Sequence, residues 1–232
     1  MIVPVYGKVY GDAEKANAHA AIDEGWLTEG KWGAEFERKL SDFTGRRFVI
    51  LCNSGSSANL LALASLELPK GSEVITTALN FPTTLNPIIQ LGLVPVFVDC
   101  TLPQMVANVD QIEAAVTDKT RAIMLAHTLG VPFDVDEVLA ICKRHNLKLV
   151  EDCCDALGTS GIFRGDVSTL SFYPAHQITT GEGGAVLTAD PRLAKIIRSF
   201  RDWGRDCWCD TGKDNTCGRR WAGDYDHKYT YS

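Results

Sequence analysis

Apolar runs of strand length alternate along most of this chain with segments in which apolar residues recur at helical spacing. The first pair is a helical segment over residues 34–43, with Phe36, Leu40 and Phe43 on one face, followed by a buried-strand run over 47–52. The same pattern predicts strands over residues 73–77, 94–99, 121–127 and 147–153, and helices over 56–66, 83–91, 110–116 and 135–145. Strands that alternate with helices form a mostly parallel sheet covered by helices on both faces, so the sequence predicts an α/β fold.

The rhythm changes after residue 155. Two closely spaced strands are predicted near 168–173 and 184–188, and a helix opens at Pro191. No internal repeat or linker interrupts the 232 residues, and 45% hydrophobic composition is enough for one large core. Such sheets bind ligands beyond the carboxyl ends of their strands. The loops that follow these strand ends are therefore the places to look for a site.

Composition excludes several classes of function. The net charge is −6, and no basic stripe is present, which argues against a nucleic-acid partner. No segment approaches the roughly 20 apolar residues of a membrane span, and the N-terminus lacks a signal pattern. We expect a cytoplasmic protein that acts on a small molecule, without a membrane partner. Eight cysteines in a reducing compartment favour metal binding or redox chemistry over disulfides.

The loop after the first strand reads NSGSSA and runs directly into a helix. Gly55 and Ser56 at a helix N-terminus offer backbone N–H groups, a hydroxyl and the positive end of the helix dipole to an anion such as phosphate. An ordinary N-cap explains the same residues. The loop is neither a Walker loop nor GxGxxG, which argues against nucleoside triphosphate and dinucleotide binding.

Two further residues follow strand ends. Asp152 comes after an apolar run, where a carboxylate either closes a turn or holds a proton on a heteroaromatic nitrogen. Phe81 lies in the loop after the strand 73–77, where it is either a stacking platform for a ring or a core residue.

The order of these motifs resembles the DegT/DnrJ/EryC1/StrS sugar aminotransferase family of fold-type I pyridoxal phosphate enzymes. The matching stretches are NSGSSA, EDCCDALG, SFYPAH and TTGEGG. The resemblance implies the three-layer large domain of that fold, with a mostly parallel central sheet, and a site for pyridoxal or pyridoxamine phosphate. Its cofactor-binding residues would be Gly55, Ser56, Phe81, Asp152, Asp155 and Ser171.

The resemblance also implies a domain organisation for residues 1–232. An N-terminal arm would cover about 1–33, the cofactor core about 34–190 and a cysteine-rich segment about 200–220. The family continues beyond this point into a small C-terminal domain, so we expect the chain to be a truncated large domain that lacks it.

His176 occupies the position of the family's Schiff-base lysine. Imidazole cannot form that Schiff base, but it can act as an acid or base near neutral pH. Ordinary transamination is therefore not expected, and the cofactor would have to work as the free amine, pyridoxamine phosphate (PMP). A hydrogen-bonding histidine in an inactive protein is the alternative.

The cysteines provide a second motif. Cys207, Cys209 and Cys217 form a C-x-C-x7-C pattern, and Cys153 and Cys154 lie beside Asp152. Three thiolates and a fourth from the distant pair could hold an iron–sulfur cluster or zinc.

Together, His176 and these cysteines resemble one subfamily, the iron–sulfur NDP-4-keto-6-deoxyhexose 3-dehydratases. That resemblance implies His176 as the catalytic base, a 2Fe–2S cluster on Cys154, Cys207, Cys209 and Cys217, and C3 deoxygenation in dideoxysugar (lipopolysaccharide O-antigen) biosynthesis. The implied partners are a nucleotide sugar (CDP-linked favoured), an NADH-dependent flavin and iron–sulfur reductase, and a second copy in a homodimer. An aminotransferase relative and a zinc-stabilised noncatalytic protein stay open as alternatives.

Overall fold

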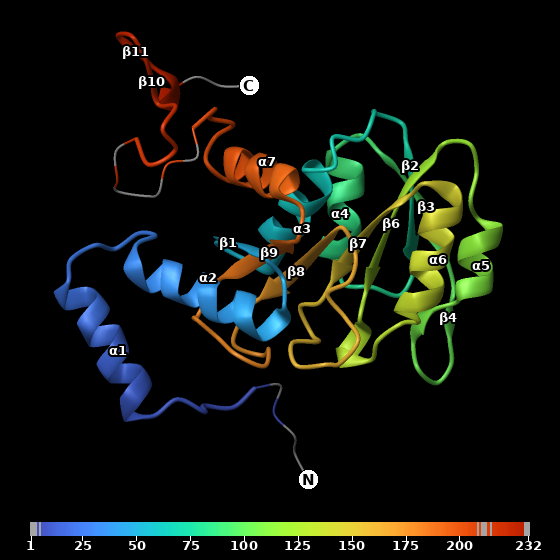
Figure 1. Ribbon diagram of the computed structural model, residues 1–232. Helices are drawn as coiled ribbons and strands as arrows, with labels where there is room; N and C mark the ends of the chain where they lie inside the picture. Colours follow the sequence, from blue (N-terminus) through green and yellow to red (C-terminus); the bar gives the residue numbers. More distant parts are fainter. Residues whose placement is uncertain (1–3, 5, 208, 210–212, 214, 230–232) are drawn as a thin grey trace.

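A computed structural model of the protein describes residues 4, 6–207, 209, 213 and 215–229 (Figure 1). The helices are α1 (Asp12–Asp23), α2 (Lys31–Thr44), α3 (Gly55–Ala64), α4 (Pro82–Gln90), α5 (Val109–Ala114), α6 (Val135–His145) and α7 (Pro191–Arg201), with 3-10 turns η1 (Thr128–Gly130) and η2 (His227–Tyr229). The strands are β1 (Phe48–Cys52), β2 (Glu73–Thr77), β3 (Val94–Val98), β4 (Cys100–Thr101), β5 (Val106–Ala107), β6 (Thr120–Ala126), β7 (Lys148–Asp152), β8 (Val167–Ser171), β9 (Gly184–Thr188), β10 (Trp221–Ala222) and β11 (Tyr225–Asp226).

Seven of these strands form one sheet in the order β1-β9-β8-β7-β6-β2-β3. From β8 to β3 all neighbours are parallel, and β9 is antiparallel to both β1 and β8. The carboxyl ends of β1, β2, β6, β7 and β8 therefore lie at the same edge. The prediction of a mostly parallel sheet is confirmed.

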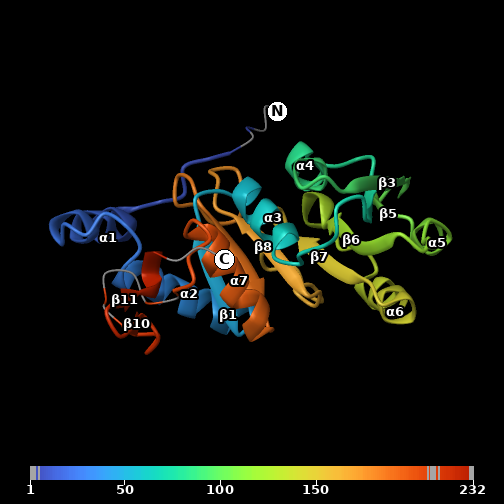
Figure 2. The same ribbon diagram turned by 90° about the horizontal axis from the view of Figure 1, so that it is seen from above.

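The sheet lies between two layers of helices (Figure 2). Alternate strand residues supply the two faces, as period-2 geometry requires. In β1, Ile50 belongs to the core cluster formed with α3 and α7, and Val49 belongs to the cluster formed with α2. In β6, Met124 faces α3, and Ile123 packs with α5 and α6. The three-layer α/β architecture follows from this alternation of buried side chains.

Local capping explains why α6 has the predicted bounds. Asp134 accepts a hydrogen bond from the Glu137 N–H at the N-terminus, and Asn146 takes a left-handed conformation at the C-terminus. Predicted and observed bounds also agree for β2 and β9, and the other predicted elements differ at their ends by a few residues.

The helix α1 was not predicted. It has no buried residue and stands off from the sheet in both views (Figures 1 and 2). Its weak amphipathic pattern explains why the sequence did not reveal it. Among the described residues, every helix is too short or too polar to cross a bilayer.

Candidate active site

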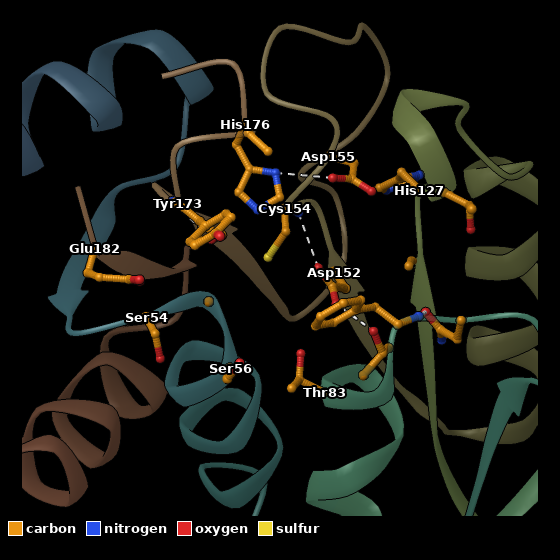
Figure 3. A pocket seen from close by; sticks show the side chains of 18 residues that line it. Ser54, Ser56, Thr83, His127, Asp152, Cys154, Asp155, Tyr173, His176 and Glu182 are labelled. Atoms are coloured by element: carbon orange, nitrogen blue, oxygen red, sulfur yellow. Dashed lines mark hydrogen bonds and ion pairs between the residues drawn. The ribbon is translucent and has the colours of Figure 1, made fainter. Parts of the chain in front are cut away.

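A cavity of about 390 Å³ opens at the carboxyl edge of the sheet (Figure 3). It is lined by every residue that the sequence proposed for the cofactor or for catalysis: Gly55, Ser56, Phe81, Asp152, Asp155, Ser171 and His176. The strand ends bring together residues up to 121 positions apart in the chain because β1, β2, β7 and β8 all end at this edge. The lining residues include no lysine in the part of the chain that the structure describes.

The N-terminus of α3 forms one wall. Ser54 caps it by accepting a hydrogen bond from the Ser57 N–H at 3.1 Å. A Cβ on Gly55 would lie 2.6 Å from the Ser171 Cβ and 3.0 Å from the Cys154 Sγ, so only glycine lets the helix approach this closely. The GEGG turn needs its last glycine for the same reason, because a Cβ on Gly184 would lie 2.3 Å from the Ser54 oxygen.

Because α3 packs so closely on the end of β8 and the start of β9, its N-terminus, Ser56 and Ser171 all line the same cavity. The first N–H groups of a helix have no intrahelical acceptor and carry a partial positive charge. The arrangement is a cradle for an anion such as a phosphate group.

Asp152 lies at the end of β7 and is 6% exposed. Its Oδ2 accepts hydrogen bonds from Asn59 Nδ2 and Thr84 Oγ1, both at 2.7 Å. Its Oδ1 accepts one from the Cys154 backbone N–H at 3.1 Å. The carboxylate lines the cavity and is held from three sides, and it is more constrained than an ordinary turn residue.

Phe81 is 70% exposed and lines the cavity at the N-terminus of α4. The core alternative for this residue is therefore wrong. An exposed aromatic face at a cavity wall can stack on a planar ring.

His176 and Asp155 point toward one another (Figure 3). The His176 Nδ1 lies 3.1 Å from the Asp155 Oδ1, and the imidazole is mostly buried. Gln177, the next residue, donates from its side chain to the Asp155 backbone oxygen. Among the described residues, the Asp155 carboxylate pairs with the His176 ring and is placed to orient it.

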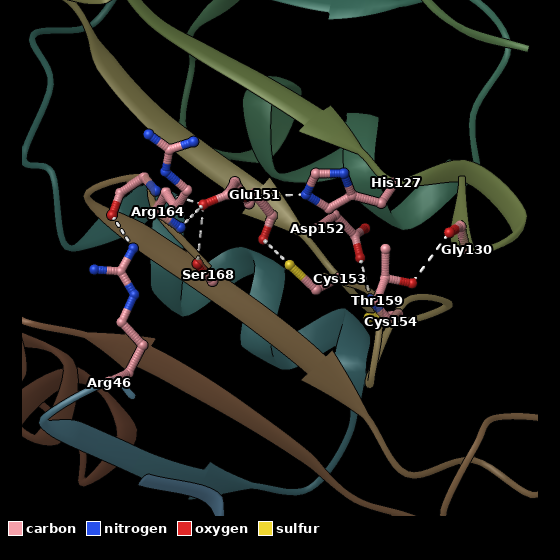
Figure 4. Close-up of polar contacts among 11 residues, drawn as sticks. Arg46, His127, Gly130, Glu151, Asp152, Cys153, Cys154, Thr159, Arg164 and Ser168 are labelled. Atoms are coloured by element: carbon pink, nitrogen blue, oxygen red, sulfur yellow. Dashed lines mark hydrogen bonds and ion pairs between the residues drawn. The ribbon is translucent and has the colours of Figure 1, made fainter. Parts of the chain in front are cut away.

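A buried pair of a glutamate and a histidine lies next to Asp152 (Figure 4). Glu151 precedes Asp152 in β7, and its Oε2 lies 3.0 Å from the His127 Nε2. The other oxygen accepts from the backbone N–H groups of Arg164 and Gly165. Burial acts to raise the pKa of Glu151, but the hydrogen bonds from His127 and Gly165 outweigh it and the pKa is lowered. The pair ties the end of β7 to β6 and to the loop before β8.

The thiols of Cys207, Cys209 and Cys217 lie within 4.8 Å of one another. Burial raises the pKa of Cys207 to about 11. For Cys209, burial is outweighed by hydrogen bonds from the Cys217 backbone and neighbouring thiols, and the pKa falls to about 7. Three of the four proposed cluster ligands are therefore gathered, and one of them ionises near neutral pH, which suits a metal-thiolate site.

Cys154 lies elsewhere, in the wall of the cavity (Figure 3). Burial raises the pKa of its thiol well above the ordinary value, and the Asp152 carboxylate adds to this. Within the described part of the chain, Cys154 is not among the thiols that gather with Cys209, so the structure does not bring the proposed fourth ligand to the other three.

A second cavity, of about 320 Å³, adjoins the cysteine segment between α2 and α7. Glu37, Arg198, Arg201 and Cys209 all line it. Burial raises the pKa of Glu37 to about 7, against the hydrogen bond that it accepts from the Leu51 N–H.

Sequence reasoning missed several residues in and behind the wall of the first cavity. Asn59 and Thr84 contact Asp152, and Tyr173, His127 and Glu182 line the wall. One signal was available, because Asn59 interrupts the apolar side of a helix whose other residues are mostly small or aliphatic.

The fold and this cavity define an α/β domain of the fold-type I pyridoxal phosphate class. A solved structure of GDP-4-keto-6-deoxymannose-3-dehydratase with a trapped PLP–glutamate geminal diamine is similar to it, with a TM-score of 0.80 and 30% sequence identity. The match covers 84% of this chain and 54% of that one. The model of the DegT/DnrJ/EryC1/StrS aminotransferase family matches residues 9–220, and the chain belongs to this family.

Two curated relatives are similar over nearly the whole chain. The lipopolysaccharide biosynthesis protein RfbH of Salmonella typhimurium is 54% identical over an alignment of 252 positions. The alignment covers 100% of this chain and 57% of the relative. The dTDP-4-dehydro-2,6-dideoxy-D-glucose 3-dehydratase of Saccharopolyspora spinosa is 52% identical over 97% of this chain and 53% of the relative. The chain thus spans somewhat more than half the length of these proteins.

Proposed function

We propose that this chain is the cofactor-binding large domain of a PMP-dependent 3-dehydratase that acts on an NDP-4-keto-6-deoxyhexose in deoxysugar biosynthesis. The observation that carries the proposal is a cavity with an anion cradle and a buried carboxylate, in which a histidine paired with Asp155 takes the place of the expected lysine. The names of the relatives and of the similar solved structure support a nucleotide-sugar substrate and a pyridoxal phosphate cofactor.

The residues present fit the cofactor. The close approach of α3 to Ser171, which no side chain at Gly55 would permit, suits a phosphate group. Asp152 would hold the ring nitrogen and Phe81 would stack on the ring. When bound, PMP supplies an amine for the sugar ketone and a ring that withdraws electrons from the adjacent carbon.

His176 would act as the base. Because its Nδ1 faces Asp155, the tautomer that donates from Nδ1 leaves the Nε2 lone pair free to take a proton. Asp155 then has a positioning effect, since its contact with Nδ1 fixes the orientation of the ring.

The cysteine segment is the basis for the remaining parts of the proposal. A 2Fe–2S cluster on Cys207, Cys209, Cys217 and Cys154 would relay single electrons from a flavin and iron–sulfur reductase. The thiols of Cys207, Cys209 and Cys217 already lie together. For Cys154 to be the fourth ligand, either the cysteine segment or Cys154 would have to move. A homodimer, CDP as the nucleotide and the domain limits 1–33, 34–190 and 200–220 stay part of the proposal.

A structural zinc site is the second candidate for the cysteines, favoured by the same gathering of three thiols without Cys154. Iron, acid-labile sulfide and zinc analysis of anaerobically purified protein separates the two. Zinc without sulfide would refute the electron-transfer role.

The dehydratase itself is tested with the full-length protein, PMP, a reductase and CDP-, dTDP- and GDP-linked 4-keto-6-deoxy sugars. Loss of the C3 hydroxyl from one of them is the expected result. Transfer of nitrogen from glutamate to the sugar, without C3 loss, would show an aminotransferase instead.

A further inference from the structure

A buried hydrogen-bond network lies behind Asp152. Asn59 is 1% exposed in the middle of α3, and both the nitrogen and the oxygen of its amide have hydrogen-bond partners. Its Nδ2 donates to the Thr83 backbone oxygen at 3.1 Å and to the Asp152 Oδ2 at 2.7 Å, and its Oδ1 accepts from the Thr169 Oγ1 at 2.6 Å.

The orientation of the Asn59 amide follows from its partners. The Thr83 carbonyl can only accept, so the amide nitrogen must face it, and the amide oxygen must face the Thr169 hydroxyl. The Thr169 hydroxyl is therefore the donor of that hydrogen bond, and Asn59 is fixed as a donor to Asp152.

Thr84 completes the arrangement from α4. It is fully buried, and its Oγ1 donates at 2.7 Å to the same Asp152 Oδ2. A carboxylate oxygen accepts two hydrogen bonds through its lone pairs. Asn59 and Thr84 occupy both lone pairs of Oδ2, whereas Oδ1 accepts one backbone N–H, from Cys154, and the residue as a whole lines the cavity.

We propose that Asn59 and Thr84 are positioning residues that fix the orientation of the Asp152 carboxylate, so that Oδ1 can accept a hydrogen bond from a protonated pyridine nitrogen. A hydrogen-bond network satisfied from four elements (α3, α4, β7 and β8) resists rotation of the side chain. The inference rests on the proposed function, because it assumes that a pyridoxal-type cofactor occupies the cavity.

A purely structural role for the network would stabilise the fold without affecting the ring. The two roles are separated by titrating PMP into the protein and by recording the ¹⁵N chemical shift of ring-labelled PMP when bound. That shift distinguishes a protonated from an unprotonated pyridine nitrogen. Thr84→Val removes one donor at nearly constant volume, and Thr84→Ser is the conservative variant that restores it.

Thr76→Val is the matched control. Thr76 is also a fully buried threonine, on β2, and its hydroxyl has no hydrogen-bond partner among the residues that the structure describes. Thr169→Val is a second test. It keeps Asn59 and Thr84, the two side-chain donors to Asp152, but removes the hydrogen bond that holds the Asn59 amide oxygen. Circular dichroism confirms that each variant is folded before it is titrated.

Thr84→Val is expected to bind PMP about tenfold more weakly, the effect of one lost hydrogen bond to a charged group, and to shift the ¹⁵N signal toward the unprotonated value. Thr169→Val is expected to move both readouts in the same direction, and Thr84→Ser and Thr76→Val are expected to match the parent. If the parent binds PMP with a protonated ring and folded Thr84→Val and Thr169→Val do the same with unchanged affinity, the positioning role is refuted and the proposed function survives. A parent that binds no PMP overturns both.

Discussion

Replacing Gly55 by alanine is expected to weaken both the fold and cofactor binding. The new methyl carbon would lie 2.6 Å from the Ser171 Cβ and 3.0 Å from the Cys154 Sγ. Carbon atoms pack at about 3.5–4.0 Å, so α3 or the end of β8 would have to move by about 1 Å. That movement displaces the helix N–H groups that form the anion cradle.

The size of the effect follows from two opposing contributions. Overpacking of this kind costs about 1–3 kcal/mol, and replacing glycine by alanine in a helix returns about 0.5–1 kcal/mol. The midpoints of these ranges give a net loss of about 1 kcal/mol, which corresponds to a fall in Tm of roughly 2–4 °C for a chain of this size. Thermal unfolding measures it, with Gly7→Ala as the control, because Gly7 is exposed and a Cβ there meets nothing within 4 Å.

A second substitution identifies the clash as the cause. Gly55→Ala combined with Ser171→Gly removes the carbon that the new methyl meets first, so part of the Tm should return. PMP affinity should not recover, because the Ser171 hydroxyl is lost from the cradle. If Gly55→Ala has the Tm and PMP affinity of the parent, or if the two substitutions show no coupling in Tm, the close packing of α3 on β8 does not have the role assigned to it.

Three further predictions concern individual groups. His176→Lys should place an amine within reach of the aldehyde cofactor and give a covalent adduct by mass spectrometry after borohydride reduction, with loss of dehydration; absence of an adduct would remove His176 from the lysine position. Cys154→Ser should lower the iron and sulfide content of the protein while Cys153→Ser does not, and equal iron content in both variants would leave Cys154 outside the cluster. Burial raises the pKa of Glu37 from 4.5 to about 7, so the folded state binds more protons than the unfolded state between these values, and parent stability falls as pH rises through this window. Glu37→Gln should therefore gain stability relative to the parent as pH increases from about 4.5 to about 7, by up to about 3 kcal/mol, which thermal unfolding at each pH measures; a pH-independent difference would contradict the assignment.

Hydrophobic periodicity was sufficient to predict most of the fold. The bounds of β2, α6 and β9 agree with the pattern because each element buries one face or both, and a strand or helix imposes its own repeat on the residues that it buries. The paired pieces β10 and β11 were missed, since two-residue strands are too short to have a period.

The candidate site could be predicted only as far as local motifs reach. The loop containing Gly55, the strand that ends at Asp152 and the position of His176 can each be read from a few neighbouring residues, and all three converge on one cavity. Their convergence was predictable because parallel strands end at a common edge.

Tertiary structure decided how these residues contact one another. Asn59 and Asp152 are 93 residues apart in the chain, and the Asp155 carboxylate, predicted to face the cofactor, has His176 as its partner. The tertiary structure likewise placed the Cys154 thiol beside Asp152 and not with Cys209. A one-dimensional pattern specifies which face of an element is buried, but the distance between two side chains on different elements depends on how α3, α4 and β7 pack together, and that packing exists only in the folded chain.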